Sequence, residues 1–319
     1  MTAAWFDSAD HVKVVEVGPR DGLQNELATI PLEIKVALVD RLSAAGFGTI
    51  EAAAFVSPKW IPQMADAAAL MQAIARKPGV TYAALVPNRQ GMQSALVAGI
   101  DEVVVFTAAS EAFTQKNIHC SIAESIARFR DVAADAKQHR IRLRGSISCA
   151  FGCPYQGAVT PESVTAVVRQ LRELGCDEID IADTIGIATP AQVRRILSAA
   201  MTEFPTATLA GHFHDTYGQA LANVYASLEC GIRIFHSSVA GLGGCPYAKG
   251  ASGNLASEDL VYLLHGLGLH TGVDLDAVVD AGSFISSHLG RVSTSRAGNA
   301  IAARRQADGA YVSDRVHRS

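Results

Sequence analysis

The segment GHFHD at residues 211–215 places two histidines two positions apart, at the end of an apolar run typical of a β-strand. Side chains two apart on a strand point the same way, so His212 and His214 share a face and Phe213 lies opposite. Two imidazoles on one face suit a divalent metal. The pattern equally fits one buried, hydrogen-bonded histidine and one surface histidine. A carboxylate on an equivalent strand end would favour the metal.

Such a carboxylate follows the first predicted strand, in the segment EVGPRDG at residues 16–22. Arg20 and Asp21 come just past an apolar run. If the strands form an α/β barrel, this position is the C-terminal end of a strand, where barrel enzymes have their active sites. The alternative is a turn that leaves both side chains in water. Glu51 ends the second strand and Asp183 follows the sixth, so both add acids at the same end. Two roles are open for both Glu51 and Asp183: to orient a ligand, or to form an ion pair with Arg20.

The segment at residues 237–254 follows the last predicted strand and is too rich in glycine for regular structure. As a mobile loop at the catalytic end, it would present its single cysteine, Cys245. The alternatives are a flexible connector or a phosphate cradle, with Cys245 as a small apolar side chain. Asn254 is an N-cap of the next helix or a metal ligand through its oxygen. Cys149 and Cys153 have no second cysteine pair, so structural zinc is not expected.

A weak internal repeat predicts the elements that position these residues. Four helical stretches end at a glycine, and a β-branched run follows each of them. Eight strands result, starting near residues 12, 49, 80, 103, 141, 179, 208 and 232. We expect an α/β fold, a (β/α)8 TIM barrel over residues 1–282, with a short helical C-terminal extension over 283–319 that frays after about residue 303. A doubly wound sheet is the alternative, but Gly-x-Gly-x-x-Gly is absent after the first strand.

Composition excludes several classes of protein. The 319 residues are 49% hydrophobic with a net charge of only -4, which excludes disorder. The lack of long basic runs argues against a nucleic-acid partner, and no stretch without a charge is long enough to span a membrane. Six cysteines in a chain of this length are no disulfide framework. Signal-peptide and transit-peptide patterns are absent, so we expect a cytoplasmic protein.

Together these segments resemble the 3-hydroxy-3-methylglutaryl-CoA lyases, a family within the wider DRE-TIM metallolyase group. The resemblance covers nearly the whole chain. It is carried by VVEVGPRDGLQNE (14–26), FVSPKW (55–60), GCPY (152–155), DTIG (183–186) and HFHDTYGQA (212–220). The most diagnostic stretch runs from Ser237 to Asn254 and contains GLGGCPYA.

The resemblance implies a lyase that cleaves (S)-3-hydroxy-3-methylglutaryl-CoA to acetyl-CoA and acetoacetate, in leucine degradation and ketone-body chemistry. It further implies an acyl-CoA substrate, a homodimer and a divalent cofactor, Mg²⁺ or Mn²⁺. The implied ligands of this metal are Asp21, His212, His214 and Asn254.

In the retro-Claisen cleavage that the resemblance implies, Arg20 and Cys245 are the implied catalytic residues. Arg20 faces the thioester oxygen, where negative charge grows as the bond breaks. Cys245 donates a proton to the enolate carbon. The base that takes the hydroxyl proton is His212, Asp183 or a bound water, because a metal-bound imidazole has its lone pair occupied. Glu51 is a further catalytic candidate.

Two residues depart from the family pattern. His236 stands where relatives usually carry aspartate, which would shift metal affinity or pH dependence if it supports a ligand. Leu27 replaces a common basic residue and removes a possible contact to a CoA phosphate. Three alternatives remain open: a Claisen-condensing synthase of the same superfamily, a lyase for a longer 3-hydroxy-3-alkylglutaryl-CoA, and a non-catalytic metal-binding barrel. The synthases usually carry a long C-terminal extension and lack the cysteine-bearing loop.

Overall fold

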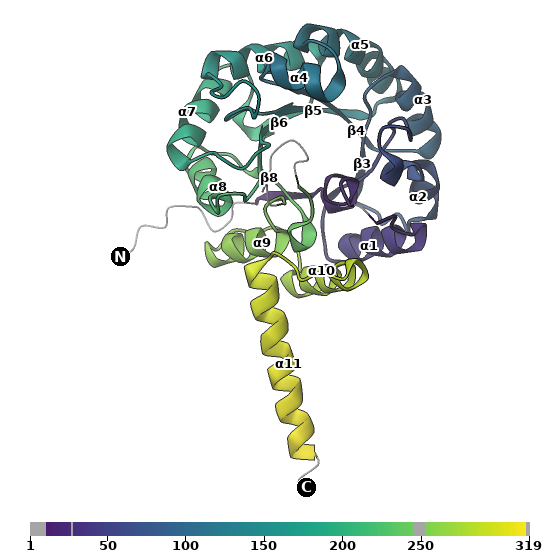
Figure 1. Cartoon of the computed structure of the whole chain (residues 1–319), viewed down its shortest axis with the longest axis vertical. Helices are drawn as coiled ribbons and strands as arrows, with labels where there is room; N and C mark the ends of the chain where they lie inside the picture. Colours follow the sequence, from purple (N-terminus) through teal and green to yellow (C-terminus); the bar gives the residue numbers. More distant parts are fainter. Residues whose placement is uncertain (1–10, 27, 245–252, 317–319) are drawn as a thin grey trace.

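Eight parallel strands pair in chain order and close on themselves where β1 pairs with β8, which confirms the predicted TIM barrel (Figure 1). The computed structural model describes residues 11–26, 28–244 and 253–316, with side chains described up to residue 308. The strands are β1 (Lys13–Glu16), β2 (Thr49–Ala54), β3 (Thr81–Leu85), β4 (Glu102–Ala108), β5 (Arg142–Ser148), β6 (Glu178–Asp183), β7 (Leu209–Phe213) and β8 (Ile234–Ser237).

Helices form a ring around these strands (Figure 1). The α-helices of the described residues are α1 (Leu32–Ala44), α2 (Ala67–Ala73), α3 (Arg89–Ala98), α4 (Glu111–Ile118), α5 (Ile122–His139), α6 (Pro161–Leu174), α7 (Pro190–Ala200), α8 (Ala220–Glu229), α9 (Ser257–Gly266), α10 (Leu275–Leu289) and α11 (Arg296–Val316). Two short turns matter for the site: η1 (Gly18–Gly22), a single π-helical turn after β1, and η4 (Val239–Gly241), a 3-10 turn after β8.

Local sequence signals set the ends of several helices. The Thr160 hydroxyl accepts a hydrogen bond from the Ser163 amide at 3.2 Å, and Pro161 opens α6. Gly175 closes the same helix at φ 92°, a left-handed conformation that glycine adopts without steric cost. Helix α1 begins directly after Pro31, whose fixed φ suits the residue that precedes a helix, and ends at Ala44.

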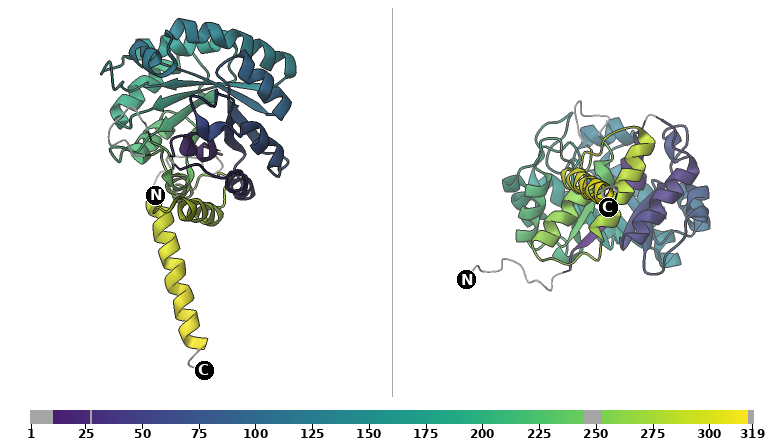
Figure 2. Two further views of the ribbon diagram at one scale, coloured as in Figure 1. Left: turned by 45° about the vertical axis from the view of Figure 1, so that its right-hand side comes forward. Right: turned by 90° about the horizontal axis from the view of Figure 1, so that it is seen from below.

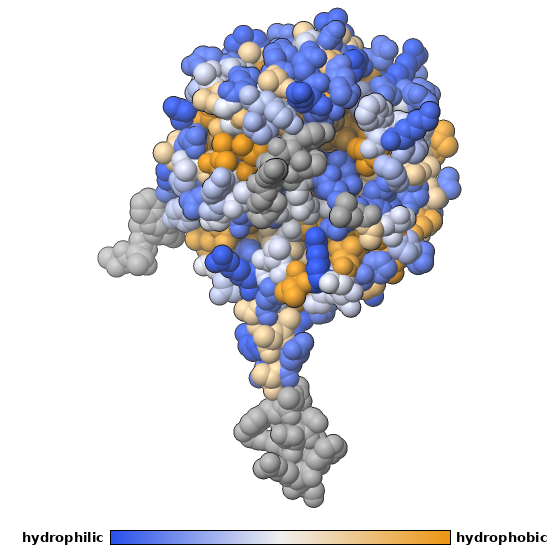
Figure 3. Space-filling view, in the orientation of Figure 1, coloured by the Kyte–Doolittle hydropathy of each residue, from blue (hydrophilic) through white to orange (hydrophobic). Residues whose placement is uncertain are grey.

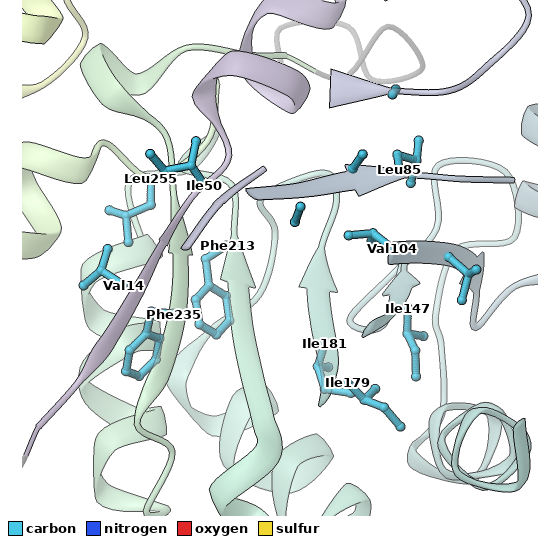
Figure 4. Packing of buried hydrophobic residues seen from close by; sticks show 14 of the residues in the cluster. Val14, Ile50, Leu85, Val104, Ile147, Ile179, Ile181, Phe213, Phe235 and Leu255 are labelled. Carbon is cyan, nitrogen blue, oxygen red and sulfur yellow. The ribbon is translucent and has the colours of Figure 1, made fainter. Parts of the chain in front are cut away.

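Strand residues alternate between two environments because successive side chains point to opposite faces. One set packs outward against the helices as a hydrophobic layer, including Ile50, Ile147, Ile181, Phe213 and Phe235 (Figure 4). The other set points into the barrel and is strongly polar. It includes Glu51, Glu102, Arg144, Glu178, Asp180, His212 and His236, all buried, beside a small apolar cluster of Val15, Val17, Ala210 and Ile234. The barrel therefore has an apolar outer layer and an ionised interior.

Helix α11 projects away from the barrel, and its first turns lie against α9 and α10 (Figures 1 and 2). The helix continues past residue 303 to Val316, and fraying of this tail stays a prediction. Alanine, arginine and glutamine favour helix here, and Arg305 pairs with Asp280 of α10 at 2.7 Å. The predicted division at residue 282 falls within α10.

The outer surface of the ring is mostly hydrophilic on the face shown in Figure 3, with smaller apolar patches. Within residues 11–26, 28–244 and 253–316, the helices lack the combined length and apolar character that crossing a membrane requires.

We expect Ile181→Ala to lower the free energy of unfolding by about 2–5 kcal/mol, because it leaves a cavity between β6 and its helices. Ile181 is fully buried, whereas Val97 on α3 is 84% exposed. Val97→Ala is therefore the matched control and should change stability by less than about 0.5 kcal/mol. Urea unfolding followed by circular dichroism measures both variants. Equal stability of the two would contradict this description of the core.

Candidate active site

The four predicted metal ligands meet at the C-terminal end of the barrel. His212 lies near the end of β7, and His214 comes directly after that strand. Asp21 lies in η1, and Asn254 forms an isolated antiparallel β-bridge with His214. Potential ligand atoms of Asp21, His212 and His214 all lie within 4.8 Å of one another. The Asn254 amide nitrogen donates to Oδ2 of Asp21 at 2.8 Å, and Nε2 of His212 is 3.8 Å from the same oxygen.

This donor set fits a divalent cation. Burial, assisted by His212, lowers the pKa of His214 to about 4, so its ring is neutral near pH 7 and keeps a lone pair. Nδ1 of His214 is buried and has no hydrogen-bond partner among the described residues, which is unusual unless the atom serves a ligand. Burial opposes ionisation of Asp21, but Arg20 and the two histidines hold its pKa below the ordinary range. A carboxylate and two imidazoles are common ligands of divalent metals.

Arg20 is held between two carboxylates, so it is not a solvated turn residue. Its guanidinium donates to Oδ1 of Asp21 at 2.8 Å and to Oε1 of Glu51. Burial raises the pKa of Glu51, but Arg20 and Arg144 outweigh burial and hold it below its ordinary value. Of the two roles open for Glu51, the structure thus places it as the partner of Arg20, and Arg20 is fixed as a cation.

Asp183 ends β6 on the same side of the barrel and anchors the turn that follows. Its two oxygens accept hydrogen bonds from the backbone amides of Ile187 at 3.1 Å and Ala188 at 2.8 Å. Burial raises its pKa to about 6, although these hydrogen bonds oppose the shift. A carboxylate with a pKa near neutrality is suited to proton transfer.

Cys245 and Leu27 lie outside the described residues. The base of the loop that carries Cys245 is described up to Gly244, whose carbonyl accepts from the Asn25 amide at 2.9 Å. Gly243 has φ 117°, and a Cβ there would come within 2.6 Å of Nδ2 of Asn254. Glycine at this position lets the loop pass directly beside a predicted metal ligand.

The ionised barrel interior was not predicted from the sequence. Arg144 donates to Oε2 of Glu51 at 2.5 Å, lies 3.1 Å from Glu102, and contacts Nε2 of His236 at 2.9 Å. Polar residues alternate with apolar ones along much of β5 and β6. This alternation is the sequence pattern from which a polar barrel interior could have been predicted. In parallel barrels both faces of a strand are usually apolar, so inward charges at these positions were not expected.

Two further buried glutamates accept hydrogen bonds from the turns η1 and η4. Glu16 accepts from the amides of Gly18 at 2.7 Å and Val239 at 2.9 Å, and from the Ser257 hydroxyl at 2.6 Å. It thereby joins η1 to η4. Glu258 accepts from the Ala240 amide at 3.0 Å. Burial raises the pKa of Glu16 to about 7 and that of Glu258 to about 8.

Residues 11–285 match the model of the HMGL-like family, which covers most of the chain. The chain belongs to the HMGL-like family. This membership confirms the resemblance that the motifs carry, and it gives the assembled site relatives of known activity.

Several relatives are close over nearly their whole length. The 3-hydroxy-3-isohexenylglutaryl-CoA/hydroxy-methylglutaryl-CoA lyase of Pseudomonas aeruginosa is 58% identical, covering 92% of this chain and 98% of the relative. The cytoplasmic 3-hydroxy-3-methylglutaryl-CoA lyase of Mus musculus is 52% identical, covering 91% and 85%. Mitochondrial members, such as that of Rattus norvegicus, are also similar.

Solved structures of the family agree with the fold. The hydroxymethylglutaryl-CoA lyase from Pseudomonas aeruginosa superposes with a TM-score of 0.91 at 57% identity, covering 93% of this chain and 99% of that one. An HMG-CoA lyase from Acinetobacter baumannii, solved with coenzyme A and 3-methylmalate, has a TM-score of 0.88 at 37% identity, covering 94% and 97%.

Asp21→Asn should weaken Mn²⁺ binding by at least about tenfold, because it removes the one charged ligand while keeping the side chain's size. Titration calorimetry with MnCl₂ measures the affinity. Asp101→Asn is the control, since Asp101 precedes β4 at the opposite end of the barrel and should leave the affinity unchanged. Unaltered binding by Asp21→Asn would place the metal elsewhere.

Glu258→Gln should flatten the fall in melting temperature between pH 6 and pH 9. The pKa of Glu258 is about 8 in the folded chain and 4.5 as its ordinary value. Between these values the folded state keeps a proton that the unfolded state has released, so the free energy of unfolding falls as pH rises. The variant mimics the neutral carboxyl and removes this contribution. Calorimetry across the pH range compares the slopes.

Glu203→Gln is the control for this measurement. Its hydrogen bond from Arg169 lowers the pKa of Glu203, so it does not titrate between pH 6 and pH 9. It should keep the slope of the unmodified protein. If Glu258→Gln also kept that slope, the buried carboxyl would not be the titrating group.

Proposed function

We propose that this chain is a metal-dependent lyase that cleaves (S)-3-hydroxy-3-methylglutaryl-CoA to acetyl-CoA and acetoacetate. The observation that carries the proposal is the assembly of Arg20, Asp21, His212 and His214 at one end of a closed barrel in a member of the HMGL-like family. The lyase names of relatives 52–58% identical over nine-tenths of the chain support the same substrate.

Asp21, His212, His214 and Asn254 would hold the ion, which is Mg²⁺ or Mn²⁺ in this proposal. When bound, a divalent ion acidifies a coordinated hydroxyl and orients the substrate. Asp21 and the neutral His214 contribute donors that remain unprotonated near pH 7. These residues would offer two oxygens and two nitrogens to the ion, and the substrate's hydroxyl and carboxylate would supply further oxygen ligands.

The reaction breaks the bond between C2 and C3 of the acyl chain. The C3 hydroxyl loses a proton and becomes the ketone of acetoacetate, and the electron pair of the broken bond forms the thioester enolate. Arg20 supplies a fixed cation for the enolate oxygen, because Glu51 and Asp21 hold its guanidinium in place. A charge that is fixed before the reaction stabilises the transition state more than the ground state.

We assign the role of the base that takes the hydroxyl proton to Asp183 rather than to His212. Both ring nitrogens of His212 are engaged, since Nδ1 contacts His236 at 3.3 Å and Nε2 faces Asp21. Asp183 has a pKa of about 6 and is therefore mostly ionised at pH 7, while still basic enough to accept a proton. Cys245 then donates its thiol proton to the enolate carbon, which gives acetyl-CoA, and the proton held by Asp183 passes to water while water reprotonates the thiolate.

The proposal extends to leucine degradation as the physiological setting, to a cytoplasmic location and to a homodimer. A second substrate has specific support, because the Pseudomonas aeruginosa relative at 58% identity is named for isohexenylglutaryl-CoA as well. A longer branched acyl chain is thus the second candidate for the same site and the same chemistry.

The test uses purified protein loaded with Mg²⁺ or Mn²⁺ and given 3-hydroxy-3-methylglutaryl-CoA. Acetoacetate, detected with its dehydrogenase, and acetyl-CoA, detected by chromatography, should form in equal amounts, and chelation by EDTA should stop the reaction. The isohexenyl substrate in parallel decides between narrow and broad specificity. Absence of both products from both substrates would overturn the proposal.

Arg20→Lys should lower kcat by about 1000-fold, by analogy with loss of a main oxyanion donor. Lysine keeps the charge but loses the planar fork that binds Glu51 and Asp21 together. Metal affinity should survive within a few fold, as measured by Mn²⁺ titration. Preserved turnover with lost metal affinity would instead make Arg20 a structural support of Asp21.

Cys245→Ser should lower turnover strongly while substrate and metal still bind, because a hydroxyl is a far weaker proton donor than a thiol. Iodoacetamide should inactivate the unmodified protein, and a substrate analogue should protect it. Cys149 and Cys153 are buried and should react slowly. Cleavage by Cys245→Ser at the unmodified rate would remove the thiol from the mechanism.

A further inference from the structure

Solvent reaches the interior of the barrel on one side. Six residues of the eight strands are not buried, and three of these are the first residues of their strands. The other three are Phe106 on β4 and Ser146 and Ser148 on β5. They lie in the C-terminal part of their strands, toward the end of the barrel where the predicted metal ligands meet.

These three side chains point into the barrel. Arg144 points inward, because its guanidinium donates to Glu51 of β2. Ser146 and Ser148 follow Arg144 at steps of two along β5 and therefore share its face. Phe106 is the register partner of Ser146, so it faces the same way. Arg144 is only 1% exposed and closes the interior below. The three side chains thus line a recess open to the C-terminal mouth, which we call the β4–β5 recess.

Small side chains leave room for this recess. Ala108 lies two residues beyond Phe106 on β4, and Ala182 lies two residues beyond the inward Asp180 on β6, so both face the interior near the mouth. The Ser146 hydroxyl donates to Oδ1 of Asp180 at 2.7 Å, so this polar atom is already paired. An occupant of the recess therefore meets the Phe106 ring and small side chains, and this favours an apolar group.

The recess faces the predicted metal site across the mouth of the barrel. The strands pair in chain order around the closed ring, so β4 and β5 lie opposite β8 and β1 (Figure 1). Arg20 and Asp21 follow β1, and Asn254 follows β8. Nearer to the recess, Ala182 on β6 is the register partner of the predicted ligand His212 on β7. The recess and the predicted ligands thus share one opening.

The chemistry of the substrate leaves one group for the recess. C3 of the acyl chain carries four groups, and the proposed function places three of them. The hydroxyl and the carboxylate arm lie at the metal ligands, and the thioester oxygen lies at Arg20. Bonds at a tetrahedral carbon point apart, so the fourth group, the alkyl substituent, points away from these residues and toward the opposite side of the mouth.

We propose that the β4–β5 recess binds the alkyl substituent on C3, and that Phe106 and Ser146 determine how long this substituent is. The substrate class is then the 3-hydroxy-3-alkylglutaryl-CoA esters with alkyl groups longer than methyl. The proposal rests on the proposed function for the places of the other three groups. Arg144 and Asp180 lie 4.0 Å apart below the recess and limit its depth with charged groups.

The first test measures binding without turnover. Esters of CoA with 3-alkylglutarates lack the C3 hydroxyl and cannot undergo the cleavage. In calorimetry with Mg²⁺, the unmodified protein should bind the 3-butyl ester about 30-fold more tightly than the 3-methyl ester, at about threefold for each buried methylene. Ser146→Phe fills the recess and should reduce this gain to less than about threefold. Phe106→Ala widens the recess and should extend the gain to a 3-octyl ester.

Ser94→Phe is the matched control, because it makes the same substitution on the exposed face of α3. It should keep the full gain with alkyl length. If Ser146→Phe does not fold, Ser148→Leu at the open end of the recess replaces it and should also lower the gain. In turnover, Ser146→Phe should lower the ratio of kcat/KM for the isohexenyl substrate to that for 3-hydroxy-3-methylglutaryl-CoA by at least about tenfold.

Three outcomes would overturn the proposal. The first is an affinity of the unmodified protein that does not depend on alkyl length. The second is a full gain with length that survives in folded Ser146→Phe, since the alkyl group would then bind elsewhere. The third is an equal loss for the methyl and butyl esters in that variant, which would place the pantetheine arm of CoA in the recess.

The binding series also separates this proposal from the proposed function. A gain with alkyl length that Ser146→Phe removes supports the recess even if neither hydroxylated ester is cleaved, and only the proposed function then fails. Cleavage of 3-hydroxy-3-methylglutaryl-CoA together with a flat binding series refutes the recess alone.

Discussion

Glu51 lies between two buried guanidinium groups, and the arrangement of the site depends on this contact. On one side it accepts from Arg20 in η1, and on the other from Arg144 in β5 at 2.5 Å. A buried charge is costly unless it is paired, so this carboxylate and the two guanidinium groups stabilise one another inside the barrel. The contact thereby fixes the η1 turn, and with it Asp21, against the interior of the barrel.

From Arg144 the polar interior continues through His236 to His212, the predicted ligand on β7. The predicted metal ligands thus lie at the C-terminal end of a connected set of buried groups and are not a local cluster in a loop. Its lower end contains acids in excess, and burial together with the neighbouring Glu178 raises the pKa of Glu102 although Arg144 opposes the shift. Cations at Arg20, Arg144 and Lys13 balance the remaining carboxylates.

The apolar layer outside the strands gives this ionised interior a rigid frame. Residues such as Ile181 and Phe235 pack the strands against the helices, and closure of the sheet leaves no free strand edge. Glu16 adds a second tie, because one carboxylate holds the amides of both Gly18 and Val239. The turn with Arg20 and the base of the cysteine-bearing loop are therefore fixed to the same atom group, which keeps both beside the barrel mouth.

Local patterns in the sequence were enough to predict the barrel and a shared face for two histidines, whereas the predicted ligand set of Asp21, His212, His214 and Asn254 rests on the family resemblance. Repeated helix–glycine–strand units define the strand order, and His-x-His fixes a shared face for His212 and His214. Local patterns did not establish that Glu51 pairs with Arg20. Nor did they predict the series of contacts that runs from Arg144 through His236 to His212. These groups are brought together by closure of the barrel, and their burial and pairing depend on distances between strands that no local pattern encodes.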